Sequence, residues 1–157
     1  MEIELYRVDE RLVHGQIIAS WSKYLGLKRI IIVDDQLAKD DFMKQVLTMA
    51  APAGIHIEVM SVEKAAERIV SDSGVGEKAM ILFKRIKYAL SLSLANPKMK
   101  ELNLGNIGAG PSRKAITKNV FLSQEEKEMI YQLQQKGVSV YLQMLYSDAK
   151  IDVSSKV

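Results

Sequence analysis

Residues 28–35 read Lys-Arg-Ile-Ile-Ile-Val-Asp-Asp, and this stretch sets the fold class. The unbroken apolar run Ile30–Val33 predicts a strand that is buried on both faces, because a strand with one wet face would alternate apolar and polar residues. Strands buried on both faces are typical of parallel sheets that carry helices on either side. The acids Asp34 and Asp35 mark the end of the strand.

Segments of strand and helix character alternate along the chain on either side of this stretch. The alternation predicts an α/β fold of three layers, with a mostly parallel sheet, helices on both faces and right-handed crossovers. A chain of 157 residues fits one domain, so we expect residues 1–157 to form a single domain. The expected strands are residues 3–8, 28–33, 55–60, 79–83, 101–104, 116–122 and 138–145, and the expected helices are residues 15–24, 40–51, 63–70, 86–94 and 123–136.

Local sequence patterns add detail to two of these helices and to the carboxyl-terminal tail. Ser123-Gln-Glu-Glu126 is a capping box, which predicts that a helix begins there, and Gly137 predicts where it ends. The residues after Ser147 are polar and predict a short tail. The helix expected over residues 40–51 carries four apolar residues at helical spacing: Phe42, Val46, Leu47 and Ala50.

Composition excludes several classes of function. The chain has no cysteine, so disulfides, thiolate metal sites and a cysteine nucleophile are excluded. Its 22 basic and 19 acidic residues are interspersed, and we therefore expect no nucleic-acid partner. No apolar run approaches the roughly 18 residues that span a bilayer, and the first five residues carry two acids where a signal peptide would have basic residues. We expect a soluble intracellular protein.

The richest polar segment follows the first expected strand, where residues 7–16 read Arg-Val-Asp-Glu-Arg-Leu-Val-His-Gly-Gln. Open α/β sheets bind ligands at the carboxyl ends of their strands, and His14 precedes a helix start, which favours an anion. Arg11 is suited to fork onto phosphate oxygens, Gly15 lets the backbone approach a ligand, and Asp9 would either accept a hydrogen bond from His14 or hold Arg11. These residues predict a phosphohistidine site with a neutral imidazole nucleophile, no metal and no cofactor.

Other candidate residues have simpler explanations. His56, the second histidine, lies in an alternating strand, where we expect a partly exposed strand residue. Asp34-Asp35 and Asp40-Asp41 are able to bind Mg²⁺, but acids are common at strand ends and in first helical turns. Gly105-x-x-Gly108-x-Gly110 lacks the P-loop lysine, and we expect its loop to line the active-site cleft. The alternative function is a non-catalytic, receiver-like regulatory domain that senses a phosphorylated partner through clustered acids.

The segment Arg7-Val-Asp9-x-Arg11-Leu-x-His14-Gly15-Gln16 resembles a known active-site signature. It is similar to that of the IIB subunits in the mannose/fructose/sorbose family of the bacterial phosphoenolpyruvate-dependent sugar phosphotransferase system. The resemblance continues in order along the chain, at Trp21, Ile31–Asp35, Asp40, Ala50-Ala51-Pro52, Leu102-Asn103-x-Gly105, Lys118 and Gly137-Val138.

The resemblance implies a phosphocarrier whose active-site loop follows the first strand. The family's matching histidine, here His14, accepts a phosphoryl group from the IIA subunit or domain and delivers it to a sugar entering through the membrane subunits IIC and IID. This is the activity of a protein-N(π)-phosphohistidine–sugar phosphotransferase. The resemblance implies a cytoplasmic protein, peripherally associated with its transporter, in which Asp9, Arg11, Gly15 and Gln16 support the phosphate. The sugar (mannose, fructose, sorbose or an amino sugar) stays open, as does the oligomeric state, with a homodimer as one alternative.

Overall fold

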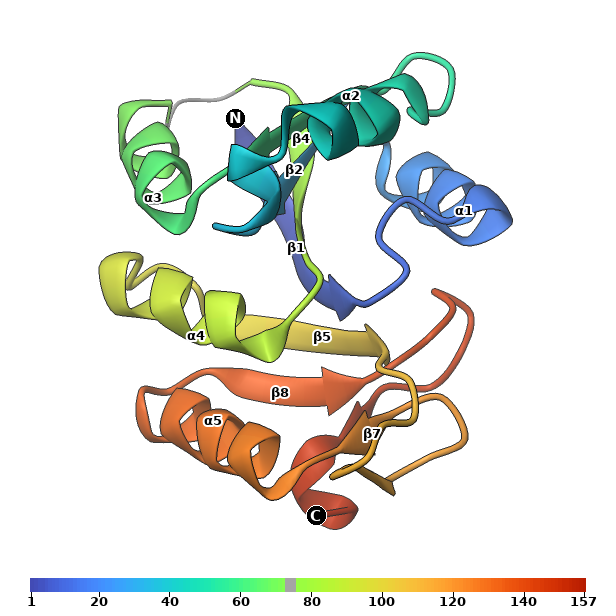
Figure 1. The fold of residues 1–157 in the computed structure, drawn as a ribbon, viewed down its shortest axis with the longest axis vertical. Helices are drawn as coiled ribbons and strands as arrows, with labels where there is room; N and C mark the ends of the chain where they lie inside the picture. Colours follow the sequence, from blue (N-terminus) through green and yellow to red (C-terminus); the bar gives the residue numbers. More distant parts are fainter. Residues whose placement is uncertain (73–75) are drawn as a thin grey trace.

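The computed structural model describes residues 1–72 and 76–157. The strands are β1 (Glu2–Asp9), β2 (Arg29–Val33), β3 (His56–Met60), β4 (Lys78–Phe83), β5 (Glu101–Asn106), β6 (Lys114–Ala115), β7 (Phe121–Leu122), β8 (Ser139–Leu142) and β9 (Ile151–Asp152). Seven of them form one sheet in the order β3-β2-β4-β1-β5-β8-β9 (Figure 1). The first six in that order are parallel, β9 is antiparallel to β8, and β6 and β7 form a separate antiparallel pair. The mostly parallel sheet is confirmed.

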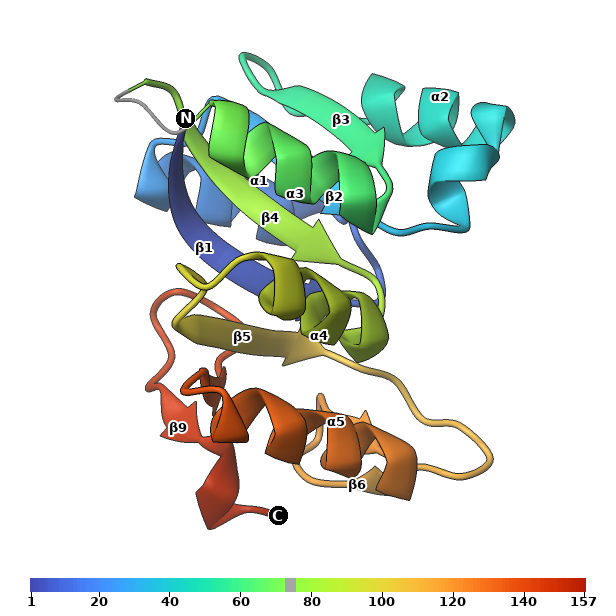
Figure 2. The same ribbon diagram turned by 90° about the vertical axis from the view of Figure 1, so that its left-hand side faces the viewer.

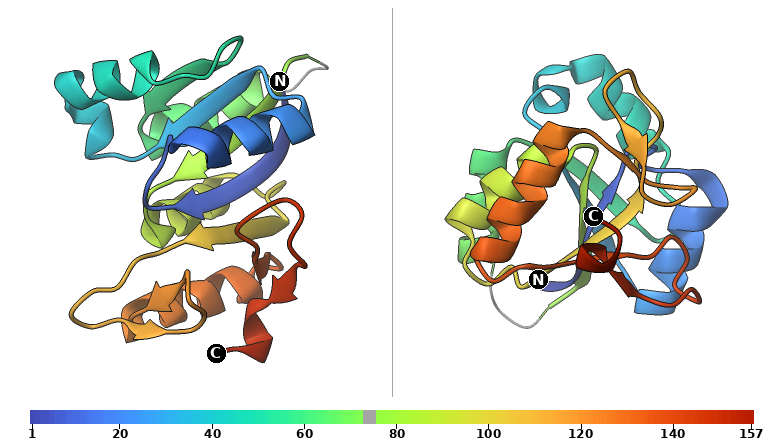
Figure 3. Two further views of the ribbon diagram at one scale, coloured as in Figure 1. Left: turned by 90° about the vertical axis from the view of Figure 1, so that its right-hand side faces the viewer. Right: turned by 90° about the horizontal axis from the view of Figure 1, so that it is seen from below.

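The helices are α1 (Gly15–Leu25), α2 (Asp41–Met49), α3 (Val62–Ser71), α4 (Ile86–Ala95) and α5 (Gln124–Gln135), with short 3₁₀ turns η1 (Leu37–Lys39) and η2 (Val153–Ser155). One face of the sheet is covered by α1 and α2, and the other by α3, α4 and α5 (Figure 2 and Figure 3). This arrangement confirms the three layers. No helix in the described part of the chain is both long enough and apolar enough to cross a membrane.

The apolar run of β2 lies at the centre of both layers of core. Ile30, Ile31, Ile32 and Val33 are each 0% exposed. Ile30 and Ile32 pack in the cluster beneath α1 and α2, whereas Ile31 and Val33 pack in the cluster beneath the other three helices. Full burial of such a side chain contributes about 1.5–3 kcal/mol. The strand is therefore buried on both faces, as its sequence predicts.

The capping box of α5 is also confirmed. The Ser123 hydroxyl accepts a hydrogen bond from the Glu126 N–H at 3.1 Å, and the Glu126 carboxylate accepts one from the Ser123 N–H at 2.9 Å. These reciprocal bonds satisfy two backbone donors that a helix start leaves without partners. Gly137 follows the helix with a φ of 88°, a left-handed angle that glycine adopts without steric cost.

Two segments near the carboxyl end differ from the expectation. The strand expected over residues 116–122 covers only Phe121–Leu122, because the Thr117 hydroxyl accepts the N–H groups of Asn119 and Val120 and bends the chain. The last long strand ends at Leu142 instead of residue 145. The residues after it form a bend and then β9, which pairs with β8. The side chain of Val153 is fully buried and packs the tail against the core.

One further expectation was wrong in part, and one helix is less buried than its apolar spacing suggests. The loop expected from Gly105 begins later, because Gly105 and Asn106 still belong to β5. In α2 only Leu47 is buried, while Phe42 and Val46 are 71% and 43% exposed. The reason is the position of α2, which lies against the edge strand β3 and η1, so only a narrow stripe of the helix meets a partner.

The crossover connections place an open position at the carboxyl end of β1. This strand lies between β4 and β5. The chain leaves β1 through α1 on one face of the sheet, and leaves β4 through α4 on the other. Diverging connections of this kind create the site where open α/β sheets bind ligands.

Candidate functional site

A tight loop joins β1 to α1 and carries His14 at its end. The Leu12 N–H donates to the Asp9 carbonyl at 2.9 Å and closes the turn. Leu12 has a φ of 56°, an uncommon angle for a residue with a side chain, and that side chain is buried in the core beneath α1. His14 lies two residues after this anchored turn and is exposed at the surface.

His14 is the N-cap of α1, and its side chain makes no capping hydrogen bond. The first N–H groups of a helix have no intrahelical acceptor and carry the positive end of the helix dipole, so an anion on His14 would be stabilised there. Gly15 has a φ of 40°, and a Cβ at this position would meet nothing within 4 Å. Glycine is therefore favoured here by the backbone angle and not by lack of space. The side chain of Gln16 lies outside the described part of the structure.

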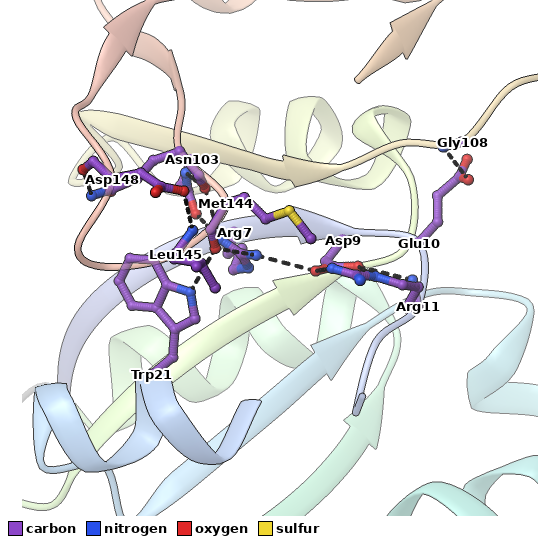
Figure 4. Close-up of polar contacts among 11 residues, drawn as sticks. Arg7, Asp9, Glu10, Arg11, Trp21, Asn103, Gly108, Met144, Leu145 and Asp148 are labelled. Atoms are coloured by element: carbon purple, nitrogen blue, oxygen red, sulfur yellow. Dashed lines mark hydrogen bonds and ion pairs between the residues drawn. The ribbon is translucent and has the colours of Figure 1, made fainter. Parts of the chain in front are cut away.

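Asp9 lies between two arginines. Its Oδ1 accepts hydrogen bonds from the backbone N–H and Nε of Arg11 at 3.0 and 3.1 Å, and its Oδ2 accepts from Nη2 of Arg11 at 3.0 Å and Nη2 of Arg7 at 3.1 Å (Figure 4). Of the two roles expected for Asp9, the structure shows the second, because the carboxylate holds Arg11. The edge formed by Nη1 and Nη2 of Arg11 still faces outward from this pair, on a side chain that is 25% exposed.

Arg7 fixes Asp9 from within the protein. Its guanidinium is 1% exposed and donates to Asp9, to the Asn103 side chain, and to the carbonyls of Gln143 and Met144. Burial lowers the pKa of Arg7, and the Asp9 carboxylate acts in the opposite direction. Asp9 is therefore paired with a buried cation, which keeps Asp9 from turning toward solvent.

An aromatic ring and a glycine complete the surroundings of Arg7. The centroid of the Trp21 ring lies 5.2 Å from the guanidinium carbon of Arg7. The Nε1 of Trp21 donates to the Met144 carbonyl at 3.0 Å. A Cβ at Gly105 would overlap the guanidinium, so only glycine fits there. These supporting residues were missed as site residues by the sequence analysis. The signal for Arg7 was its spacing, since residues i and i+2 of a strand share a face and Asp9 follows two positions later.

Glu10 points the other way, toward the loop after β5. Its Oε1 accepts from Nη1 of Arg113 at 2.6 Å, and its Oε2 accepts from the Gly108 N–H at 2.9 Å. The glycine-containing loop therefore contacts the loop that carries His14. No local pattern in the sequence pairs Glu10 with Arg113, because the two residues lie 103 positions apart.

The other acidic candidates serve the backbone, as the simpler explanation predicts. Asp34 and Asp35 accept hydrogen bonds from N–H groups at η1 and at the start of α3, and Asp40 caps α2 through the Met43 N–H. His56 is an exposed residue of the edge strand β3, near Glu58. Among the described residues, no group of three or more His, Asp or Glu side chains lies close enough to hold a metal ion.

The His14 site is open to solvent. In the described part of the chain, cavities of about 1080, 580, 550 and 480 Å³ are lined by other residues and not by His14. A small substrate is normally held in a concave pocket that buries most of its surface. An exposed imidazole, three residues after an arginine that Asp9 holds, is accessible to a large partner.

Comparisons with known proteins show the family to which the chain belongs. Residues 3–157 match the family of the PTS system sorbose subfamily IIB component. The chain belongs to this family. It is 35% identical to the fructose-specific EIIB component of Bacillus subtilis over 97% of this chain and 93% of the relative. The crystal structure of the IIB domain of the Klebsiella pneumoniae sorbose permease superposes with a TM-score of 0.92, at 31% identity over 99% of this chain and 96% of that one.

Membership identifies the chain as a IIB component, a phosphocarrier in sugar transport, which confirms the recognition made from the sequence. IIB components are phosphotransferases of sugar uptake. The chain is also 29% identical to the mannose-specific EIIAB component of Escherichia coli, of which it spans about half the length. The fusion of IIA and IIB in that relative supports a IIA protein as the partner of a IIB component.

Proposed function

We propose that His14 is the residue of this IIB component that carries the phosphoryl group. It accepts the group from phosphorylated IIA and passes it to a sugar that enters through the membrane subunits IIC and IID. The observation that carries the proposal is the exposed imidazole at the start of α1, three residues after an arginine that Asp9 holds in place. The family and the EIIAB fusion support the donor.

The transfer step needs a nucleophile and a way to stabilise charge. A neutral ring nitrogen of His14 attacks phosphorus while the N–P bond of the donor histidine breaks, so the phosphoryl group changes rings without a metal. The outward edge of Arg11 and the first N–H groups of α1 meet the negative charge on the phosphoryl oxygens. In the second transfer a sugar hydroxyl oxygen binds phosphorus, the N–P bond of His14 breaks, and the hydroxyl proton passes to a base of the transporter.

Several finer properties belong to this proposal. Residues 1–157 act as a single IIB domain with protein-N(π)-phosphohistidine–sugar phosphotransferase activity. It works on the cytoplasmic face of the membrane, peripherally associated with IIC and IID. The named specificities of its relatives, which include fructose, sorbose, mannose and N-acetylgalactosamine, support a sugar of this class as the acceptor.

The direct test is to locate the phosphoryl group. The protein is incubated with phosphorylated IIA, with and without EDTA, and the modified residue is identified by mass spectrometry. We expect an acid-labile, base-stable phosphoryl group on His14 in both samples. Modification of an aspartate, or strict dependence of this step on Mg²⁺, would contradict the mechanism and direct attention to Asp34 and Asp35.

Arg11 should determine the rate of this transfer. Loss of a charge-assisted hydrogen bond costs about 1.5–3 kcal/mol, so Arg11→Ala should slow transfer from phosphorylated IIA by about tenfold or more. Arg11→Lys should recover only part of the rate, because an ammonium cannot bind Asp9 and two phosphate oxygens with the same fork. Arg29→Ala is the control, since Arg29 lies at the start of β2, at the opposite end of the parallel strands from the loop that carries His14. Stopped reactions at fixed times measure the rates, and equal rates in all four proteins would show that Arg11 has no part in transfer.

A further inference from the structure

The loop that carries His14 is held from two sides. Asp9 reaches one side of the loop and binds Arg7, while Glu10 reaches the other side and binds the Gly108 N–H (Figure 4). Glu10 also binds Arg113. The first contact belongs to the buried centre described above. The second contact joins the loop to a part of the chain that no step of the phosphoryl transfer uses.

All three nitrogens of the Arg113 guanidinium are engaged. Nη1 donates to Oε1 of Glu10 at 2.6 Å and to the Gly108 carbonyl at 3.0 Å. Nε and Nη2 donate to the two carboxylate oxygens of Glu126, each at 2.9 Å. The side chain is only 18% exposed. A guanidinium that forks onto one carboxylate and also holds a second has little freedom to rotate.

The far end of this network is rigid. Glu126 belongs to the capping box at the start of α5, so its carboxylate is held by the Ser123 N–H as well as by Arg113. Burial acts to lower the pKa of Arg113, but the hydrogen bonds and charges of Glu126 and Glu10 outweigh it, and the pKa is raised. The chain of contacts runs from the capped helix through Arg113 to Glu10, and Glu10 is adjacent to Arg11 in sequence.

We propose that Arg113 is a positioning residue for phosphoryl transfer, which through Glu10 fixes the loop that presents Arg11 and His14. The inference rests on the proposed function of His14. Arg113 does not touch the phosphoryl group; it acts by holding Glu10. Without it, the Glu10 carboxylate keeps the Gly108 N–H as its one side-chain contact among the described residues, and this side of the loop loses its ion pair. Reacting groups must be held within a fraction of an ångström, so a loosened loop slows the chemical step without changing how the partner docks.

The test compares Arg113→Ala, Arg113→Lys and Glu10→Gln with a matched control, Arg29→Ala. Arg29 is a suitable control because its side chain is 20% exposed and pairs with two carboxylates, those of Glu58 and Glu77. It lies at the start of β2, and therefore at the opposite end of the parallel strands from His14. Each variant is phosphorylated by IIA over a range of donor concentrations to separate kcat from KM. Each is also phosphorylated by phosphoramidate, a small donor that needs no docking.

We expect Arg113→Ala to lower kcat about tenfold with KM for phosphorylated IIA unchanged, and to lower the phosphoramidate rate by the same factor. Glu10→Gln should give a smaller loss and Arg113→Lys a partial recovery, because one ammonium cannot hold both carboxylates. Arg29→Ala should leave both rates within twofold of the wild type. Amide hydrogen exchange should become faster in residues 10–15 of Arg113→Ala and not in those of Arg29→Ala.

Three outcomes would overturn the inference. The first is equal rates in Arg113→Ala and Arg29→Ala. The second is a rise in the KM of Arg113→Ala without a fall in its kcat. The third is a loss of rate in Arg113→Ala with IIA but not with phosphoramidate, which would make Arg113 a docking residue. Mass spectrometry of the wild type in the same experiment keeps the two proposals apart. Phosphorylation of His14 together with normal rates in Arg113→Ala removes only the role of Arg113, whereas phosphorylation elsewhere removes the proposed function.

Discussion

Replacement of His14 by alanine should abolish phosphoryl acceptance and leave the fold unchanged. The imidazole is exposed and makes no capping hydrogen bond, so its loss removes the nucleophile and almost no packing. We expect the free energy of unfolding to change by less than about 0.5 kcal/mol, as is usual for an exposed position without special contacts. Without a ring nitrogen at this position no N–P bond can form, so the fraction of protein that carries labelled phosphoryl groups should fall to background.

The natural control is His56→Ala. His56 is the second histidine of the chain and lies exposed at the start of β3, the edge strand of the sheet. Its replacement should leave phosphorylation by IIA at the wild-type level. Quantitative label transfer followed by urea unfolding, monitored by circular dichroism, measures both properties. Normal labelling of the His14 variant, or its unfolding in buffer, would refute the expectation.

The parts of the fold that sequence predicts well depend on local information. The run Ile30–Val33 is short, consists of β-branched residues and has no polar residue to face solvent, which favours a strand covered on both sides. The capping box at Ser123 involves residues three positions apart, and its geometry follows from backbone donors that every helix start leaves free. In both cases the deciding interactions lie within the segment itself.

Predictions fail where the deciding partner is distant or where burial depends on the neighbours of an element. Periodicity shows that Phe42 and Leu47 belong to an amphipathic helix, but not how much of that helix the sheet edge covers, and only Leu47 is buried. Likewise, the polar tail gives no sign that β9 pairs with β8. Arg113 has no local feature that separates it from other surface arginines, because its carboxylate partner Glu10 lies 103 positions away.

The residues of the site also fall into two groups: those that the sequence indicates and those that it does not. The candidates His14, Arg11, Asp9 and Gly15 lie in one short segment that sequence and family resemblance both indicate. The residues that hold this segment in place come from β5, the bend after β8 and α1, and no local rule connects them. Gly105 is the clearest example, because nothing in its own sequence neighbourhood reveals that it makes room for a buried guanidinium.

Among substitutions that add one methyl group to a residue of the site, Gly105→Ala should therefore be the most destabilising. The added Cβ would overlap the Arg7 guanidinium. A free arginine would swing aside at little cost, but this one is 1% exposed and bound to Asp9, Asn103 and two backbone carbonyls. Overpacking costs about 1–3 kcal/mol, and each buried polar group left without its partner costs about 1–3 kcal/mol more. We expect a loss of about 3 kcal/mol in the free energy of unfolding, and slower phosphoryl transfer because Asp9 loses one of its two arginines.

A double-mutant cycle identifies the cause of that loss. In Arg7→Met the guanidinium is absent, so adding Gly105→Ala should cost less than about 1 kcal/mol, because the group that the new Cβ would displace is already gone. Gly110→Ala is the control, since a Cβ there would lie 3.4 Å from the Arg113 side chain, an ordinary contact, and should change stability by about 0.5 kcal/mol or less. Urea unfolding of the five proteins gives the four differences. If Gly105→Ala costs as much in the Arg7→Met background as in the wild type, the guanidinium is not what excludes a side chain from this position, and Arg7 would then hold Asp9 without requiring a glycine across from it.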